Sequence, residues 1–324
     1  MAWKGIPNNP HWQYNDAPAD PGANSPYRPL WLKQTAGVRT NSDGNKVYTM
    51  VRKVGDTSDN SLGEISKTFW DADGNDLKFQ MEVEVESPSD FTIPCQEDGG
   101  VEFDATIDWG DGTTTTTTTY NGAGLTHTYA AAGRYKIMIG GTFPNIFFNG
   151  GGDKLLVQQV LNLGHVGWTK LNNAFQGCAN LIQFSAGSSD TSNVTSFISM
   201  LQGCVDLTVP ELGFSTSSAQ RIDAFFFQDD GVVDVSGIQN WDITSLTVTP
   251  ADHLYLFMIG PAKMSTATYD ALLVNWEGQN PANTVGMGRV KFGASQFTLS
   301  SAAATAKQVL ADTYGWTITD GGGV

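Results

Sequence analysis

Apolar residues recur at a fixed interval between residues 171 and 246. The recurring pairs lie 26 residues apart and are Phe175 and Leu201, Cys178 and Cys204, and Leu181 and Leu207. A third step of the same length predicts that Phe227, Asp230 and Val233 continue the pattern without a cysteine. A period of about 20 to 50 residues is typical of a solenoid, whose units bury their apolar faces only against one another. We therefore expect a short solenoid.

The apolar positions within one repeat have the spacing of a helix. Over residues 194–207 they fall on one face of a 3.6-residue period. Thr191 or Ser192 supplies an N-cap hydroxyl, and Gly203 lets the chain leave the helix. The run 208–214 that follows is too short for a second helix and indicates an extended segment. The sequence therefore predicts coils of one helix and one short strand, which is the leucine-rich-repeat plan.

The two cysteines of the repeat are predicted to be buried and unpaired. Cys178 and Cys204 occupy equivalent places on neighbouring predicted helices, whose axes lie about 8–10 Å apart. A disulfide needs Cα atoms nearer than about 7 Å, so a bridge is the less favoured alternative. The chain has three cysteines and no CxxC pair, which indicates neither a disulfide framework nor a metal knuckle.

These repeats resemble the BspA-type leucine-rich repeat surface proteins. The resemblance rests on Phe-Gln-Gly-Cys-Ala-Asn-Leu at 175–181 and on Asp-Thr-Ser-Asn-Val-Thr at 190–195. The third unit departs from the family pattern, with Asp229 and Asp230 where the Gly-Cys pair is expected. What the resemblance implies is surface display and adhesion to partners, without catalysis.

Segments on both sides of the repeats support the same resemblance. Residues 141–149 are similar to the family's usual lead-in, and residues 264–276 and 302–320 are similar to its closing cap. The two cap segments also have helical patterns of their own, with Ser265 and Ser301 as N-caps. A terminal repeat of this kind hides the open end of the apolar core.

Ahead of the repeats, the chain resembles a PKD or immunoglobulin-like sandwich. The residues that carry this resemblance are 103–112, with the motif Asp-Trp-Gly-Asp-Gly, and 127–139, which begin with His-Thr-Tyr. In that family the first motif ends one strand and turns tightly into the next. Trp109 offers a large ring for packing, and Gly110 and Gly112 permit positive φ.

Four aspartates are weak candidates for metal ligands. Asp108 and Asp111 belong to the sandwich motif, where we favour turn hydrogen bonds over cation binding. Asp71 and Asp73 lie in an oxygen-rich stretch that is similar to a calcium loop. However, Glu82, at the twelfth loop position, falls within a predicted strand at 77–85, so a hairpin turn is the preferred interpretation.

The first forty residues combine six prolines with several tryptophans and tyrosines. Proline interrupts regular elements, whereas a disordered linker would be poor in aromatic residues. This composition predicts an extended arm that packs its rings on its own domain or on a neighbouring subunit. The segment 1–10 shows no apolar core of a secretory leader.

Surface proteins of the BspA type reach the outside by secretion, so a chain without a visible leader needs another route. Export inside a bacteriophage particle is the route we favour. A mature form numbered from an added methionine, or a C-terminal or non-standard signal, is the alternative.

Charge and composition narrow the classes of partner. Lysine and arginine number 18 against 33 aspartates and glutamates, which gives a net charge of −15. This balance argues against binding to the nucleic-acid backbone, which needs a cationic surface. No window of about 18 apolar residues occurs, so no membrane insertion is expected.

The sequence contains none of the common motifs of catalytic sites. Four histidines occur, none of them at metal-ligand spacing from another histidine, cysteine or carboxylate: His11, His127, His165 and His253. Neither a Gly-x-Ser-x-Gly elbow nor a phosphate-binding Gly-x-x-x-x-Gly-Lys loop is found. A carboxylate pair for glycoside hydrolysis depends on spatial separation and stays open at this stage. We predict no cofactor and no enzymatic activity.

The predicted fold class is multidomain, β-rich plus α/β. Residues 1–88 form a proline-rich arm with a small β domain, residues 89–149 a PKD or immunoglobulin-like β-sandwich, and residues 150–324 a short solenoid with a C-terminal cap. A homo-oligomer is compatible with the sequence, although no heptad pattern argues for one.

The predicted function is that of a bacteriophage virion protein, either a capsid decoration or a tail-associated fibre protein on the outer surface. It would contact other virion proteins through its N-terminal region and a host surface polysaccharide or protein through its projecting domains. The alternatives are a bacterial cell-surface adhesin and a carbohydrate-binding accessory module.

Overall fold

The computed structural model describes residues 38–40, 46–48, 77–86, 88–247, 254, 256–284 and 288–324. The chain divides into two compact units, Met1–Asp76 and Leu77–Val324. In the first unit, β1 (Val38–Thr40) pairs antiparallel with β2 (Lys46–Tyr48). The other expectations for this unit, including the aromatic arm and the candidate calcium loop at Asp71 and Asp73, lie outside the described residues.

The second unit begins with a six-stranded mixed sheet, in the order β10-β9-β3-β8-β5-β6. Its strands are β3 (Phe79–Val85), β5 (Asp104–Asp108), β6 (Thr114–Thr117), β8 (Gly133–Thr142), β9 (Val157–Asn162) and β10 (Gln183–Phe184). β3 alternates as its sequence predicts, because every second side chain from Phe79 to Val85 enters the core. All pairs are antiparallel except β9 with β10, which is parallel.

β3 lies in the middle of this sheet, between β8 and β9. It therefore shares its core with the strands of the predicted sandwich. The compact units accordingly separate between Asp76 and Leu77, earlier in the chain than the boundary expected after residue 88. The three-part division at residues 88 and 149 stays a prediction.

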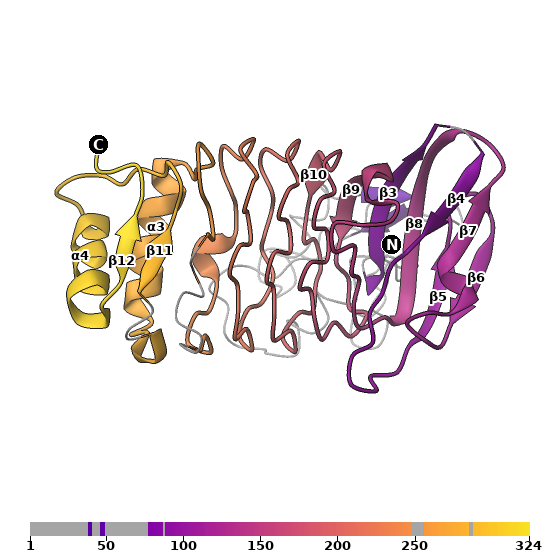
Figure 1. Ribbon diagram of the computed structural model, residues 1–324, viewed down its shortest axis with the longest axis horizontal. Coiled ribbons are helices and arrows are strands. Elements are labelled where there is room, and N and C mark those ends of the chain that lie inside the picture. The colour runs from indigo at the N-terminus through magenta and orange to yellow at the C-terminus, as the bar shows by residue number, and fades with distance from the viewer. Residues whose placement is uncertain are drawn as a thin grey trace, which may run out of the picture. The chain divides into compact units, whose positions relative to one another are not determined.

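A second pair of strands packs against the sheet. β4 (Ser89–Thr92) and β7 (Thr126–Tyr129) are antiparallel and lie beside β5, β6 and β8 in Figure 1. The Tyr129 ring of β7 stacks on the Tyr135 ring of β8 at 4.0 Å between centroids. This contact joins the pair to the six-stranded sheet.

After β9, the chain runs through successive segments that lie side by side, here called the first, second and third coils (residues 164–189, 190–214 and 215–241). Figure 1 shows them between the sheet and the C-terminal helices. Backbone N–H groups on alternate residues of one coil donate to carbonyl groups of the next. Examples are Phe175 N to Met200 O at 2.9 Å and Leu201 N to Phe225 O at 3.2 Å.

The helix predicted in each coil is not formed. Between residues 190 and 207, all within the described chain, the backbone has turns and isolated bridges. N–H groups bond to carbonyl groups three residues earlier, as in Met200 to Phe197, Cys204 to Leu201 and Leu207 to Cys204. Consecutive turns of this kind bring every third residue inward, so they imitate the spacing of a helical face. Other backbone N–H groups form hydrogen bonds with the neighbouring coil instead of within a helix.

The third coil also begins one residue earlier than the constant period predicts. Its buried positions are Phe226, Asp229 and Val232, each 0% exposed, and not Phe227, Asp230 and Val233. The φ angles agree: the positive values at Gly177 and Gly203 continue at Gln228, and the interval shortens from 26 to 25. The expectation that Asp230 replaces the cysteine is therefore wrong by one position.

The C-terminal part is helical, as its caps predict. α3 (Thr266–Gly278) begins where the Ser265 hydroxyl accepts a hydrogen bond from Thr268 N, and α4 (Ala302–Tyr314) begins at Ser301 in the same way. α4 ends at Gly315, whose φ of 72° is left-handed. β11 (Arg289–Lys291) and β12 (Thr317–Thr319) pair in parallel beside these helices.

Among the described residues, short 3-10 turns also occur at Ala123–Leu125, Lys154–Leu156, Ile238–Asn240 and Ala282–Thr284. The buried apolar residues of the second unit form one cluster that runs from the sheet through the coils to α3 and α4. Among the described residues, no helix is long and apolar enough to cross a membrane.

Candidate functional site

The turn between β5 and β6 carries the motif that the sequence singles out. Trp109 N donates to Thr113 O at 3.1 Å and closes the turn. Gly110 has a φ of +82°, and a Cβ at this position would lie 2.5 Å from the Lys136 carbonyl oxygen. Gly112, with a φ of +90°, has nothing within 4 Å of its missing Cβ. Glycine is therefore required at the first position for two reasons and at the second for one.

The two aspartates of the motif hold the turn together. Asp108 Oδ1 accepts a hydrogen bond from Gly110 N at 3.0 Å. Asp111 Oδ1 accepts from Thr113 N at 3.0 Å and from Thr113 Oγ1 at 2.6 Å. These are the turn hydrogen bonds that the sequence analysis favours. Among the described residues, no group of three or more His, Cys, Asp or Glu side chains is arranged to hold a metal ion.

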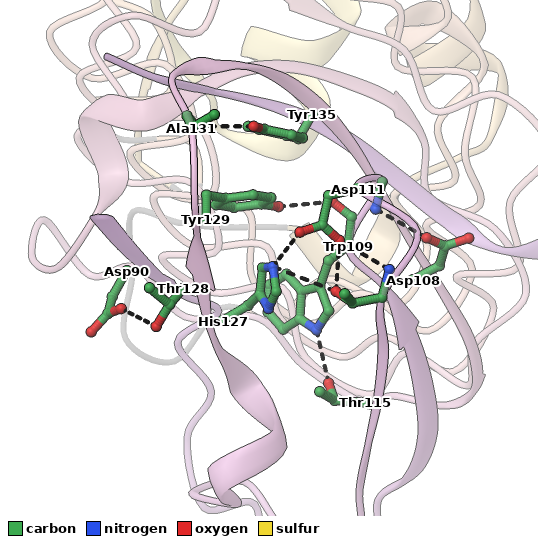
Figure 2. Close-up of polar contacts among 12 residues, drawn as sticks. Asp90, Asp108, Trp109, Asp111, Thr115, His127, Thr128, Tyr129, Ala131 and Tyr135 are labelled. Carbon is green, nitrogen blue, oxygen red and sulfur yellow. Dashed lines mark hydrogen bonds and ion pairs between the residues drawn. The ribbon is translucent and has the colours of Figure 1, made fainter. Parts of the chain in front are cut away.

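An aromatic cluster surrounds the same turn (Figure 2). The His127 ring stacks on Trp109 at 5.1 Å between centroids and meets Tyr129 edge-on at 4.7 Å. The Trp109 ring is buried, its Nε1 donates to Thr115 Oγ1 at 2.9 Å, and its carbonyl oxygen accepts from the Tyr129 hydroxyl at 2.9 Å. The polar atoms of the Trp109 and Tyr129 side chains therefore each have a specific partner.

His127 is also joined to the turn by its carboxylate neighbour. His127 Nε2 lies 2.7 Å from Asp111 Oδ2. Burial alone would raise the pKa of Asp111, but hydrogen bonds from Thr113 and His127 outweigh it and lower the pKa to about 2. The carboxylate is therefore ionised across the range in which proteins usually work.

The geometry of these groups is that of a structural contact. In a nucleophilic triad, one ring nitrogen of histidine faces the carboxylate and the other faces the hydroxyl. Here the same atom, His127 Nε2, faces both Asp111 and Thr113, and the Thr113 hydroxyl donates to the carboxylate. No nucleophile is activated by this arrangement, so the cluster fixes β5, β6 and β7 relative to one another.

The coil positions singled out by the sequence are all buried: Phe175, Cys178, Leu181, Leu201, Cys204 and Leu207. Cys178 and Cys204 are free thiols. Burial raises the pKa of both, which keeps them protonated. Cys204 Sγ donates to the carbonyl oxygen of Phe175 at 3.2 Å, which ties the second coil to the first.

Asp229 is the residue that sequence reasoning misses. It continues the row of Cys178 and Cys204 in the third coil and is 0% exposed. Its neighbour Asp230, to which a constant period of 26 assigns the place, is exposed. The signal in the sequence is the apolar spacing around Asp229: Phe226 lies three residues before it and Val232 three residues after it, and both are buried. This spacing, and not a fixed interval of 26, identifies Asp229 as the inward position.

Comparison with protein-family models, with curated proteins and with solved structures finds no match to this chain.

Proposed function

We propose that this protein is a non-enzymatic structural and adhesive component of a bacteriophage particle, either a capsid decoration or a tail-associated fibre protein. The observation that carries the proposal is the ladder of backbone hydrogen bonds between coils, which is covered at both ends. At one end β10 of the first coil pairs with β9 of the sheet. At the other end, Met258 bridges to Phe292, next to the helical cap.

Such an arrangement holds side chains at fixed places on neighbouring coils. The hydrogen bond between Gln176 and Gln202, at 2.8 Å, links side chains of equivalent positions on the first and second coils. The Thr191 hydroxyl in turn donates to Ser215 O at 2.6 Å. A surface held in this way suits recognition of an extended or repetitive partner, because little ordering is needed on binding.

For the finer fold, we propose that the coils are a short solenoid of the BspA leucine-rich repeat type, closed by α3 and α4. The six-stranded sheet with the β4–β7 pair would be the PKD or immunoglobulin-like part. The family motifs support this proposal, as do the parallel bridges that step from Ser185 through Glu211 to Ser236. The irregular length of the third coil departs from a strict repeat.

We further propose that the N-terminal region joins other virion proteins, and that the sandwich and coils face a host surface polysaccharide or protein. The His127–Asp111 pair is engaged in the turn of the sandwich, which supports a binding role over a catalytic one. The net charge of −15 favours a neutral or cationic partner over an anionic polymer.

Two experiments test the two halves of the proposal. Mass spectrometry of purified phage particles from the same source should find this chain, in hundreds of copies for a decoration or in a few to a few dozen for a tail appendage. Recovery from the host envelope and from no particle would contradict the virion setting and support a bacterial adhesin.

For adhesion, the purified full chain should bind host cells, and the Leu207→Asp variant, which places a charge in the core of the second coil, should bind less while hydrogen exchange in β5 and β8 shows that the sheet is still folded. Equal binding of both proteins would place recognition outside the coils. Absence of binding by the intact protein would contradict adhesion.

A further inference from the structure

The row formed by Cys178, Cys204 and Asp229 places a carboxyl group where two coils have a thiol. A residue with positive φ precedes each of the three: Gly177, Gly203 and Gln228. All three members of the row are 0% exposed. The chain therefore buries an ionisable carboxyl at a position that otherwise holds a small, neutral side chain.

Among the described residues, no cationic side chain pairs with the Asp229 carboxyl group. Within the described part of the chain, neither of its carboxyl oxygens has a hydrogen-bond partner. The N–H groups of Gly203 and Cys204 lie near it on the second coil, but they donate to Phe227 O at 3.0 Å and to Leu201 O at 3.2 Å. A buried carboxylate without partners is strongly unfavourable, so the group is expected to keep its proton in the folded state.

The charged groups at this corner point outward. Asp230 on the same coil, Asp206 on the second coil and Lys263 on the following segment are exposed. The Cys204 thiol is the titratable group that faces Asp229 from the second coil, and it is neutral because burial raises its pKa. In the described part of the following segment, residues 256–264, Lys263 is the one ionisable side chain.

Asp229 lies between hydrogen bonds that close the third coil on both sides. Val233 N donates to Thr208 O of the second coil at 3.0 Å. Toward the cap, Phe226 N donates to Phe257 O at 2.9 Å and Lys263 N donates to Val232 O at 3.0 Å. Water reaching an ionised carboxylate here would have to separate at least one of these pairs.

We propose that Asp229 is a pH-sensitive lock in the coil stack: protonated, it lets the third coil close against both neighbours, and its ionisation opens the stack at this coil.

The direction of the pH effect follows from the titration of this group. Burial raises the pKa of Asp229 to about 8, against the lowering effect of the Cys204 and Gly203 N–H groups, and Asp230 adds to the rise. In the unfolded chain the same group loses its proton near pH 4. Between these two pH values the folded state holds one more proton than the unfolded state. The stability that protonated Asp229 contributes is therefore fully present below about pH 4 and is lost as pH rises to about 8.

The test compares wild-type protein with Asp229→Asn, which cannot ionise, and with Asp230→Asn as the matched exposed control. The unfolding equilibrium constant of the wild type, relative to Asp229→Asn, should rise by up to about tenfold per pH unit between pH 5 and 8. Asp230→Asn should follow the wild type. Amide exchange at Phe226, Val233 and Lys263 should accelerate above pH 8 in the wild type relative to Asp229→Asn.

Two further measurements keep the proposal open to contradiction. If Asp229→Asn does not fold, Asp229→Cys places the side chain of the other two coils there and should lack the wild-type rise between pH 5 and 8, because a thiol ionises only near pH 8.5. In the wild type, the carboxyl carbon of Asp229, observed by NMR, should titrate well above pH 6. Titration near pH 4, parallel pH profiles for wild type and Asp229 variants, or loss of the dependence in Asp230→Asn would each overturn the proposal.

Discussion

At the scale of single residues, the turn after β5 separates two reasons for glycine. Gly110 and Gly112 both have φ angles in the left-handed region, +82° and +90°. Only at Gly110 would an added Cβ also clash with the backbone, because it would lie 2.5 Å from the Lys136 carbonyl oxygen. The pair therefore offers a matched comparison of backbone strain with and without a steric clash.

We expect Gly112→Ala to lower the free energy of unfolding by about 1–2 kcal/mol, the cost of a left-handed alanine. Gly110→Ala should cost more, because β5 or β8 must also shift to clear the Lys136 carbonyl group. Urea denaturation followed by tryptophan fluorescence measures both. Equal losses would mean that the clash is relieved without cost.

Asp111 makes the same turn sensitive to acid. Its folded pKa of about 2 is lower than the ordinary value near 4. Its contribution to stability is therefore fully present above about pH 4 and is lost as pH falls toward about 2. Melting temperatures measured from pH 6 to pH 2 should fall further in the wild type than in Asp111→Asn, which is less stable at neutral pH. Parallel curves for the two proteins would contradict this assignment.

At the scale of elements, local signals were easier to predict than those that depend on neighbours. α3 and α4 begin at the expected serines because a cap is decided within one turn of chain. The sequence of the coils predicts helices because successive three-residue turns give nearly the same apolar spacing as a helix. What separates the two is the partner of each N–H group, and in the coils that partner lies about 25 residues away in the chain.

The same reasoning explains the missed position in the third coil. A constant period follows the chain, whereas burial follows the ladder between coils, and the loss of one residue before the third coil shifts its inward positions, such as Phe226, Asp229 and Val232. Phe226 thus replaces Phe227 in the core, and Asp229 replaces Asp230. The turn at Trp109 could be predicted in more detail, because the hydrogen bonds from Gly110 N, Thr113 N and Trp109 Nε1 reach no further than six positions.

Buried threonines show how one coil is held to the next. The hydroxyls of Thr191 and Thr216 donate to carbonyl oxygens of the following coil, Ser215 O at 2.6 Å and Asp242 O at 2.9 Å. Thr191→Val keeps the shape of the side chain but leaves that carbonyl without its donor, so it should cost about 1 kcal/mol. Thr208→Val, at an exposed position of the second coil, is the control and should be nearly neutral. Chemical denaturation measures the free energy of unfolding of both variants. An unchanged value for Thr191→Val would mean that water replaces the hydroxyl as the donor to Ser215 O.

At the scale of the second unit, Leu77–Val324, stability is expected to pass from coil to coil. The ladder joins each coil to its neighbours, and the buried apolar residues form one cluster from the sheet to the cap. The ring of Trp276 on α3 packs against Phe292 at 6.0 Å and against Trp316 at 6.4 Å between centroids. In stacks of this kind, an end that loses its cover frays inward.

Leu310 on α4 provides the means to test this transmission. It is 0% exposed, so Leu310→Ala should lower stability by about 2–5 kcal/mol through the lost burial and the cavity left behind. Gln308→Ala, on the exposed face of the same helix, should change stability by less than about 0.5 kcal/mol.

Hydrogen exchange then shows in which direction along the coils the loss of stability spreads. In Leu310→Ala the amide of Met258, which donates to Lys291 O, should lose protection first, and that of Phe175 in the first coil last. A uniform loss at both amides would instead mean that sheet, coils and cap unfold as one cooperative block, because the cavity would then be felt equally at every rung of the ladder.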